Sequence, residues 1–131
     1  MNVHIYSLKG HRKQNEDAHV VILNGDGKNK NLKNINMFTI FDGHGGKDVS
    51  DHLKKTYPKY FINPKVKYPL NKEYVINAYN AIQNDIKAQP FSKNIGSTCL
   101  SVMHYKFNND NYLNILNTGD SRCILCRDNF A

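Results

Sequence analysis

The apolar residues of the chain fall into short runs separated by polar stretches, and the runs follow two different periods. Runs rich in β-branched and aromatic residues predict strands, whereas apolar residues three or four positions apart predict helices. The predicted strands cover residues 1–8, 18–23, 37–41, 97–105, 112–116 and 123–125, and the predicted helices cover 46–57 and 71–88. Strands, then two helices, then strands indicate an α+β fold with a mostly antiparallel sheet.

Each predicted helix has one apolar stripe and is followed in the sequence by a proline. Helix 46–57 is followed directly by Pro58, and helix 71–88 begins at a capping residue, Asn71, and is followed by Pro90. The stripes consist of Val49, Leu53 and Tyr57 in the first helix and of Val75, Ala78, Tyr79, Ile82 and Ile86 in the second. We expect both stripes to be buried against the sheet.

Three further segments have distinct patterns. Strand 37–41 is apolar at nearly every position, which predicts a central strand covered on both faces. Residues 24–36 are rich in Gly, Asn and Lys and predict a loop, and residues 107–111 predict the turn of a hairpin.

The length of 131 residues corresponds to one domain, and 40% hydrophobic residues suffice for a core. No apolar run approaches the roughly 20 residues that span a bilayer, and the first residues do not resemble a secretory signal. We therefore expect a soluble protein of the cytoplasm or the nucleus, without a membrane partner.

The formal net charge of +7 comes mainly from lysines that are scattered among asparagines. Nucleic-acid binders usually gather Lys and Arg on one face, so this distribution favours solvated loops and predicts no nucleic-acid partner. Attraction to phosphorylated or acidic partners remains open.

Three cysteines do not make a disulfide framework. Cys123 and Cys126 have C-x-x-C spacing, but in a strand positions i and i+3 face opposite sides, so they would not share a metal ion. We expect one buried and one partly exposed thiol at these two positions.

Four acids lie beside predicted strand ends: Glu16, Asp17, Asp42 and Asp120. Carboxylates at one end of a sheet could hold Mg²⁺ or Mn²⁺, which prefer oxygen ligands. In "FTIFDGHGG" (38–46), the glycines leave the backbone carbonyls accessible, and a helix N-terminus follows. Asp beside Gly is also ordinary turn chemistry, and the residues alone leave both interpretations open.

The segments together resemble the metal-dependent protein serine/threonine phosphatases of type 2C. "GHRKQNEDAH" (10–19) is similar to the first block of that family, and "DGHGG" (42–46) is similar to its most diagnostic block. "GSTC" (96–99) and "LNTGDSRCILCR" (116–127) are similar to two later blocks in the same order. The resemblance implies an antiparallel β-sandwich flanked by helices, in α-β-β-α layers.

The resemblance also implies roles for single residues. Asp42 would bridge two Mg²⁺ or Mn²⁺ ions, the Gly43 carbonyl and Glu16 would support one of them, and Asp17 would brace the metal shell. Arg12 would bind the substrate phosphate, His44 would protonate the leaving oxygen, and Asp120 would belong to a weaker third metal site. The substrates would be phosphoserine and phosphothreonine in proteins.

The catalytic domain of that family is roughly twice as long and contributes two further aspartates from later blocks. The resemblance therefore predicts that residues 1–131 are the N-terminal portion of one catalytic domain, with weak metal binding on their own, in a protein that is monomeric at full length. A catalytically inactive phosphatase-like binding module is the alternative. A nucleotide-binding loop is disfavoured because the phosphate-binding G-x-x-x-x-G-K-[ST] pattern is absent.

Overall fold

The structure is a computed structural model that describes residues 1–25, 27, 32–91 and 93–127. Its strands are β1 (Ala18–Ile22), β2 (Ile35–Phe41), β3 (Gly43–His44), β4 (Gly96–Ser97), β5 (Cys99–Phe107) and β6 (Asp110–Thr118). Its helices are α1 (Asp48–Thr56), α2 (Pro58–Phe61) and α3 (Lys72–Lys87). The predicted α+β class is confirmed, in a partial form with one main sheet.

The main sheet has four antiparallel strands in the order β1-β2-β5-β6, and β3 pairs with β4 beside it. The predicted turn between the last two strands is confirmed, because Asn108 and Asn109 connect β5 to β6 with φ angles of 50° and 69°. Asparagine tolerates this left-handed conformation, which tight hairpin turns require. The loop predicted at 24–36 lies partly outside the described residues, and β2 already begins at Ile35.

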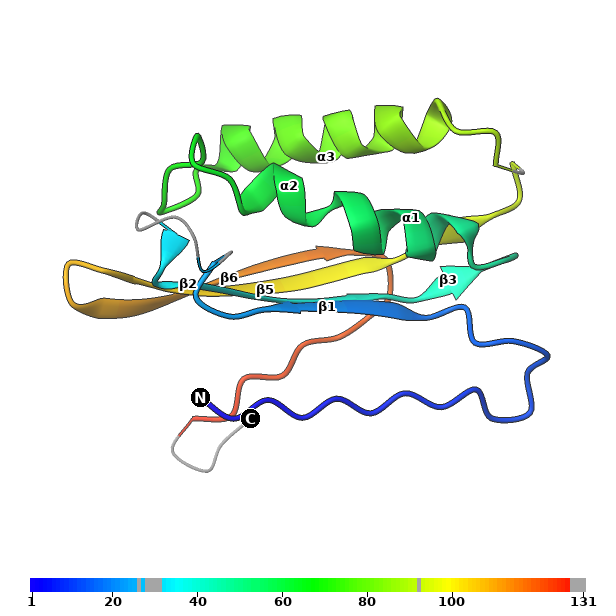
Figure 1. The fold of residues 1–131 in the computed structure, drawn as a ribbon, viewed down its shortest axis with the longest axis horizontal. Coiled ribbons are helices and arrows are strands. Elements are labelled where there is room, and N and C mark those ends of the chain that lie inside the picture. Colours follow the sequence, from blue (N-terminus) through cyan, green and yellow to red (C-terminus); the bar gives the residue numbers. More distant parts are fainter. Residues whose placement is uncertain (26, 28–31, 92, 128–131) are drawn as a thin grey trace.

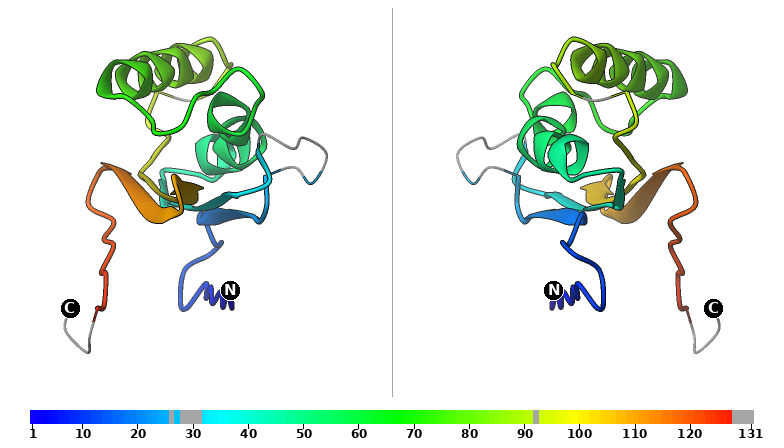
Figure 2. Two further views of the ribbon diagram at one scale, coloured as in Figure 1. Left: turned by 90° about the vertical axis from the view of Figure 1, so that its left-hand side faces the viewer. Right: turned by 90° about the vertical axis from the view of Figure 1, so that its right-hand side faces the viewer.

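All three helices cover the same face of the sheet, as the end-on views show (Figures 1 and 2). Alternate residues of a strand point to one face, and in β2 and β5 these include Met37, Phe41 and Met103, which are fully buried. They pack against the helix stripes, in which Val49, Leu53, Tyr57, Ala78 and Ile82 are buried and Tyr79 and Ile86 are partly buried. The predicted stripes are thus confirmed.

The helix ends follow local chemistry. The side chain of Asn71 accepts a hydrogen bond from the Tyr74 backbone N–H at 2.6 Å, which confirms the predicted cap of α3. Pro58 follows the end of α1, as predicted, but it also opens the short helix α2, where a missing N–H costs no hydrogen bond. Among the residues that the structure describes, no helix has the length and apolar character needed to cross a bilayer.

The other face of the sheet carries no helix, and three predictions about it were wrong. Strand β2 is covered on one face only, since Ile40 is 47% exposed. Residues 1–8 and 123–125 are not strands; both segments run below the sheet (Figure 1) without a described partner strand to complete their hydrogen bonds. Cys123 and Cys126 are therefore both exposed, whereas Cys99 on β5 is buried.

Candidate functional site

A cleft of about 770 Å³ opens where β2 ends, and it is lined by residues 8–9, 12–17 and 42–45. Two chain segments form it: the one that leads into β1 and the one that follows β2. They meet because the strands are antiparallel neighbours, with the first residue of β1, Ala18, opposite the last residue of β2, Phe41. The cleft thus contains Arg12, Glu16, Asp17, Asp42, Gly43 and His44, which are six of the seven site residues predicted from the sequence.

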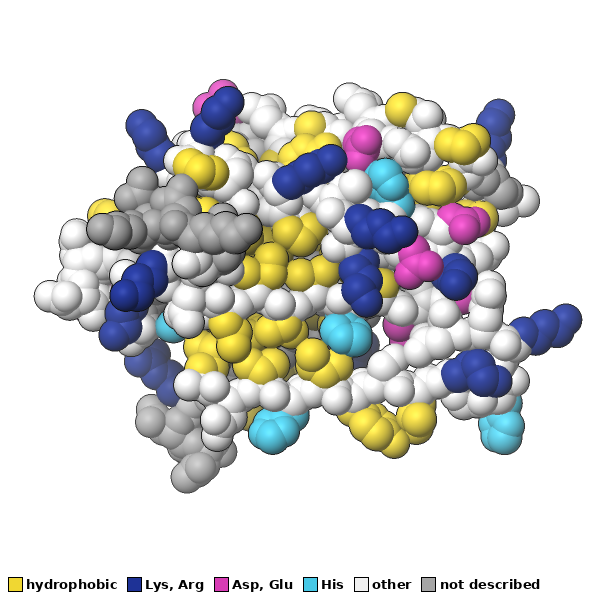
Figure 3. Space-filling model, in the orientation of Figure 1, with side chains coloured by type: hydrophobic (Ala, Val, Ile, Leu, Met, Phe, Trp, Pro, Cys, Tyr) yellow, Lys and Arg dark blue, Asp and Glu magenta, His cyan; other side chains and the backbone are white. Residues whose placement is uncertain are grey.

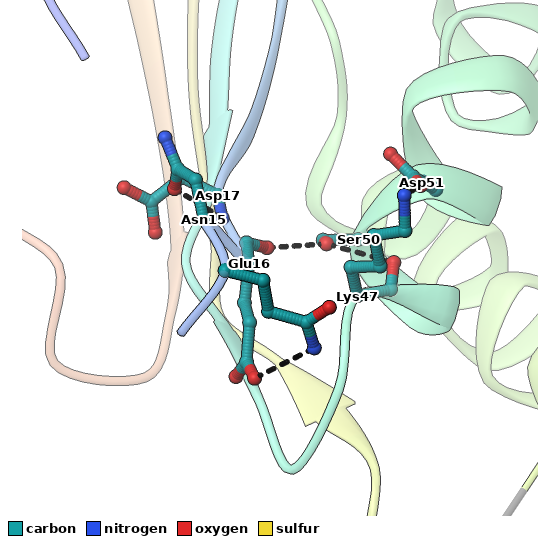
Figure 4. Close-up of polar contacts among 7 residues, drawn as sticks. Asn15, Glu16, Asp17, Lys47, Ser50 and Asp51 are labelled. Atoms are coloured by element: carbon teal, nitrogen blue, oxygen red, sulfur yellow. Dashed lines mark hydrogen bonds and ion pairs between the residues drawn. The ribbon is translucent and has the colours of Figure 1, made fainter. Parts of the chain in front are cut away.

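The backbone of Glu16 is fixed to the start of α1. The Ser50 hydroxyl lies 2.5 Å from the Glu16 carbonyl oxygen and 3.0 Å from that of Lys47, and Ser50 itself is fully buried (Figure 4). A side chain at Gly43 would collide with the same Glu16 carbonyl. Gly43 and Ser50 therefore allow the segment before β1, the segment after β2 and the start of α1 to pack closely together beside the cleft. The Glu16 carboxylate accepts a hydrogen bond from the Gln14 side chain at 3.2 Å.

Asp17 follows a small turn in which the Asn15 side chain accepts a hydrogen bond from the Asp17 N–H at 3.0 Å. The side chains of Glu16 and Asp17 point in different directions from the extended segment (Figure 4). Asp17 and Asp42 also line a second cleft of about 260 Å³, to which Ser121 contributes. The two acids therefore lie between the main cleft and the loop that follows β6.

Asp42 is held by its backbone, not by its carboxylate. Its N–H donates to the Thr98 hydroxyl at 3.1 Å, and its carbonyl accepts from the Thr98 N–H at 2.9 Å. Within the described part of the chain, the Asp42 carboxylate has no hydrogen bond or ion pair, so it is available to a ligand.

Asp120 is the predicted site residue that the structure does not bring into either cleft. Its neighbour Ser121 is near, because the Ser121 hydroxyl lies 2.8 Å from the Thr98 hydroxyl that contacts Asp42. The loop that carries Asp120 is thus connected to the site through Thr98.

His44 takes its position from a two-residue ladder. It lies in β3 opposite Gly96 of β4, and its imidazole covers Gly96 so closely that any side chain there would collide with the ring. Gly45, with a φ of +73°, turns the chain sharply away toward α1, and it also leaves no room for a side chain. Glycine at 96 therefore leaves room for the exposed imidazole, which lines the cleft.

Arg12 projects from a turn that begins at Lys9. The Arg12 N–H donates to the Lys9 carbonyl at 3.3 Å, and the Lys9 ammonium donates back to the Arg12 carbonyl at 2.6 Å. Gly10 provides the positive φ of 58° inside this turn. Among the described residues the Arg12 guanidinium has no hydrogen-bond or ion-pair partner, although three acids line the same cleft.

The cleft offers the type of ligand atom, oxygen, that a hydrated divalent cation prefers. Asp42, Glu16 and the Gly43 carbonyl offer oxygen atoms, which Mg²⁺ and Mn²⁺ prefer, and Mg²⁺ commonly binds through one or two carboxylates while keeping several waters. Within residues 1–25, 27, 32–91 and 93–127, no group of three His, Cys, Asp or Glu side chains is close enough to hold an ion on its own. The chain therefore offers part of a coordination shell.

Comparison with known proteins identifies the family. The family model described as protein phosphatase 2C matches residues 1–131, and the chain belongs to this family. Members of the family generally depend on Mg²⁺ or Mn²⁺. The predicted resemblance is thereby confirmed.

Three relatives illustrate the range of the family. "Uncharacterized protein R306" of Acanthamoeba polyphaga mimivirus is 32% identical over 99 residues, which cover 72% of this chain and 89% of the relative. Protein phosphatase 1L of Bos taurus is 32% identical over 95% of this chain and 35% of its own length. The integrin-linked kinase-associated serine/threonine phosphatase 2C of Mus musculus is 31% identical over 96% of this chain and 35% of its own length. The chain thus spans about a third of the two animal phosphatases.

Sequence reasoning missed the residues that support the site. Ser50 and Thr98 act through hydrogen bonds to the backbone of Glu16 and Asp42, and such bonds leave no periodic signal. Lys9 acts in the same way on the Arg12 turn. Thr98 could have been noticed because it belongs to the block "GSTC" (96–99), which resembles a block of the phosphatase family.

Proposed function

We propose that this chain is the N-terminal portion of a catalytic domain that hydrolyses phosphoserine and phosphothreonine in proteins with the help of Mg²⁺ or Mn²⁺. The observation that carries the proposal is that one cleft contains the Arg12 guanidinium and the Asp42 carboxylate, both without a partner among the described residues, and the exposed His44 imidazole. Membership of the protein phosphatase 2C family and the names of the animal relatives support it. The bound substrate would be a phosphorylated segment of another protein.

Each group suits one requirement of phosphate-ester hydrolysis. Arg12 would bind the phosphate, because its planar fork of N–H donors matches two phosphate oxygens. Asp42, Glu16 and the Gly43 carbonyl would hold the ions, and Asp17 would brace them from its place beside Asp42. When bound, a pair of divalent ions supplies an activated water and neutralises charge on the phosphate. Phosphate-monoester hydrolysis needs such help because it is among the slowest uncatalysed reactions.

His44 would deliver the proton. A serine or threonine oxygen leaves as an alkoxide unless it is protonated, and histidine is the side chain that most often makes such a proton transfer. The ring lies over Gly96 and lines the same cleft as Asp42, which supports this role. Asp120 would contribute to a weaker third ion, although it lines neither cleft.

The test is phosphate release from a phosphoserine peptide with and without 1 mM Mn²⁺, together with Mn²⁺ binding followed by electron paramagnetic resonance. Asp42→Asn keeps the backbone bonds to Thr98 and should abolish both signals, whereas Asp110→Asn in the β5–β6 hairpin should change neither. Hydrolysis that persists in EDTA or in Asp42→Asn would remove the metal mechanism. Peptide binding without hydrolysis in any metal, in a protein that also carries the two later aspartates, would favour the inactive binding module.

A further inference from the structure

We propose that the cleft selects phosphorylated segments with acidic residues next to the phosphorylated serine or threonine, and that Lys13 and Lys9 are the residues that select them. The inference rests on the proposed function, since it concerns the substrates of the same site. It assigns a role to two cations that the phosphatase chemistry itself does not use.

The charges that line the cleft are separated along the chain. Three cations, Lys9, Arg12 and Lys13, lie within five consecutive positions of the N-terminal segment. The acids of the cleft, Glu16, Asp17 and Asp42, come from the entry to β1 and the end of β2. In Figure 3, Lys and Arg side chains project from the end of the molecule at which the N-terminal segment turns back toward β1 (Figure 1).

The three cations form no ion pair with the acids that line the same cleft, among the residues that the structure describes. Among the described residues the ion pairs are Lys47–Asp51 and His52–Asp85, both outside the cleft lining. Lys13 is exposed and has no hydrogen-bond partner there, while Lys9 uses one donor on the Arg12 carbonyl. An ammonium group has three donors, so Lys9 keeps two for a ligand.

A phosphopeptide fits this arrangement better than a nucleic acid does. A continuous run of phosphates would have to pass Glu16, Asp17 and Asp42 as well as the lysines, and like charges would repel it there. A peptide can place its one phosphate against Arg12 and its neighbouring carboxylates against Lys9 and Lys13. The remaining negative charge of the peptide then meets the lysines.

Lys9 has a second task as a positioning residue for Arg12. Its ammonium closes the turn by bonding to the Arg12 carbonyl at 2.6 Å, so its loss would loosen the guanidinium as well as remove a charge. Lys13 makes no such bond and would act through charge alone. Replacing Lys9 and replacing Lys13 should therefore change peptide affinity in different ways.

The experiment measures the affinity of fluorescent phosphoserine peptides by anisotropy in Mn²⁺, with Glu or with Gln at the positions flanking the phosphoserine. We expect tighter binding of the Glu peptide, and we expect Lys13→Gln to reduce its affinity roughly two- to fivefold, as for one exposed ion pair, without changing the affinity for the Gln peptide. Lys106→Gln, an exposed lysine of β5 outside the cleft, is the matched control. Raising the salt concentration should shrink the preference.

Lys9→Gln should weaken both peptides, and Lys9→Arg should restore both, because arginine can again donate to the Arg12 carbonyl. Equal affinity for the two peptides, a preference that Lys13→Gln leaves undiminished, or tighter binding of a single-stranded oligonucleotide of equal charge would each overturn the inference. Affinity is read separately from phosphate release. A preference without hydrolysis would therefore contradict the proposed function while the charge selection stands.

Discussion

The α-carbon of Gly43 lies directly against the backbone carbonyl of Glu16, so closely that no side chain fits between them. This contact joins the segment after β2 to the segment before β1, and each segment contributes acids to the cleft. Gly43→Ala should therefore separate the two segments and displace Glu16 and Asp42 from each other. Overpacking of this kind typically costs about 1–3 kcal/mol.

The Gly43→Ala variant should show a lower midpoint of thermal unfolding and a weaker affinity for Mn²⁺, measured by calorimetry. Gly27→Ala is a useful comparison, because a side chain there would meet nothing within 4 Å and would add only the strain of its φ of +69°. We expect that variant to lose stability but to keep more of its Mn²⁺ affinity. Unchanged metal affinity in Gly43→Ala would show that the contact does not set the geometry of the acids.

Ser50→Ala removes the hydroxyl that donates to Glu16 and leaves the Glu16 carbonyl without this partner. Leaving a buried acceptor unpaired costs roughly 1–3 kcal/mol. The variant should be less stable and should bind Mn²⁺ more weakly, because the segment bearing Glu16 is no longer fixed to α1. Thr56→Ala removes a comparable bond within α1, from the Thr56 hydroxyl to the His52 carbonyl at 3.0 Å, and is the matched control. If both variants lose equal metal affinity, Ser50 has no particular role at the site.

The sequence predicted best those features that depend on local pattern. The stripes of α1 and α3, the Asn71 cap and the hairpin turn at Asn108 and Asn109 are each set by neighbouring residues, and all are present. The predicted β-strand at 18–23 and the predicted central strand at 37–41 also match β1 and β2 within a few residues.

The predictions failed where an element depends on a distant partner. Residues 1–8 alternate weakly, but a strand requires a hydrogen-bonded neighbour, and this segment pairs with no strand among the described residues. The pair β3–β4 was missed for the converse reason, since two residues on each side carry too little pattern to be recognised. The same holds at the site: the motifs identified the acids, but the bonds from Ser50 and Thr98 that fix them became visible only in the structure.

Gly96→Ala should displace the His44 imidazole, because the new methyl group would collide with the ring. If His44 delivers the proton, the turnover number should fall by about 10²–10⁴-fold, the usual contribution of general acid catalysis, while peptide affinity changes little. Ser97→Ala, the adjacent residue of β4, should leave the ring in place and serves as the control. A variant that loses peptide affinity instead of turnover would assign His44 to binding.

A final prediction concerns alkaline pH and the buried polar cluster between the sheet and the helices. The Tyr57 and Tyr79 hydroxyls lie 3.1 Å apart, and the Tyr79 hydroxyl lies 3.6 Å from the Cys99 sulfur. Burial raises the pKa of Cys99 from its ordinary 9.0 to about 11, and it raises the pKa of both tyrosines as well. The neutral forms are therefore favoured in the folded protein.

The raised pKa of Cys99 makes the stability of the folded protein depend on pH. Between pH 9 and pH 11 the unfolded chain loses the thiol proton while the folded chain keeps it, so stability is complete below pH 9 and falls as pH rises through this range. Two pKa units correspond to a loss of about 2–3 kcal/mol from Cys99. Urea unfolding at pH 8, 9, 10 and 11 measures it, and Cys99→Ala should show a shallower decline over the same range. If stability falls equally with pH in the unsubstituted protein and in Cys99→Ala, the thiol is solvated in the folded state. Alkylation of Cys99 at pH 8 as fast as that of the exposed Cys123 would lead to the same conclusion.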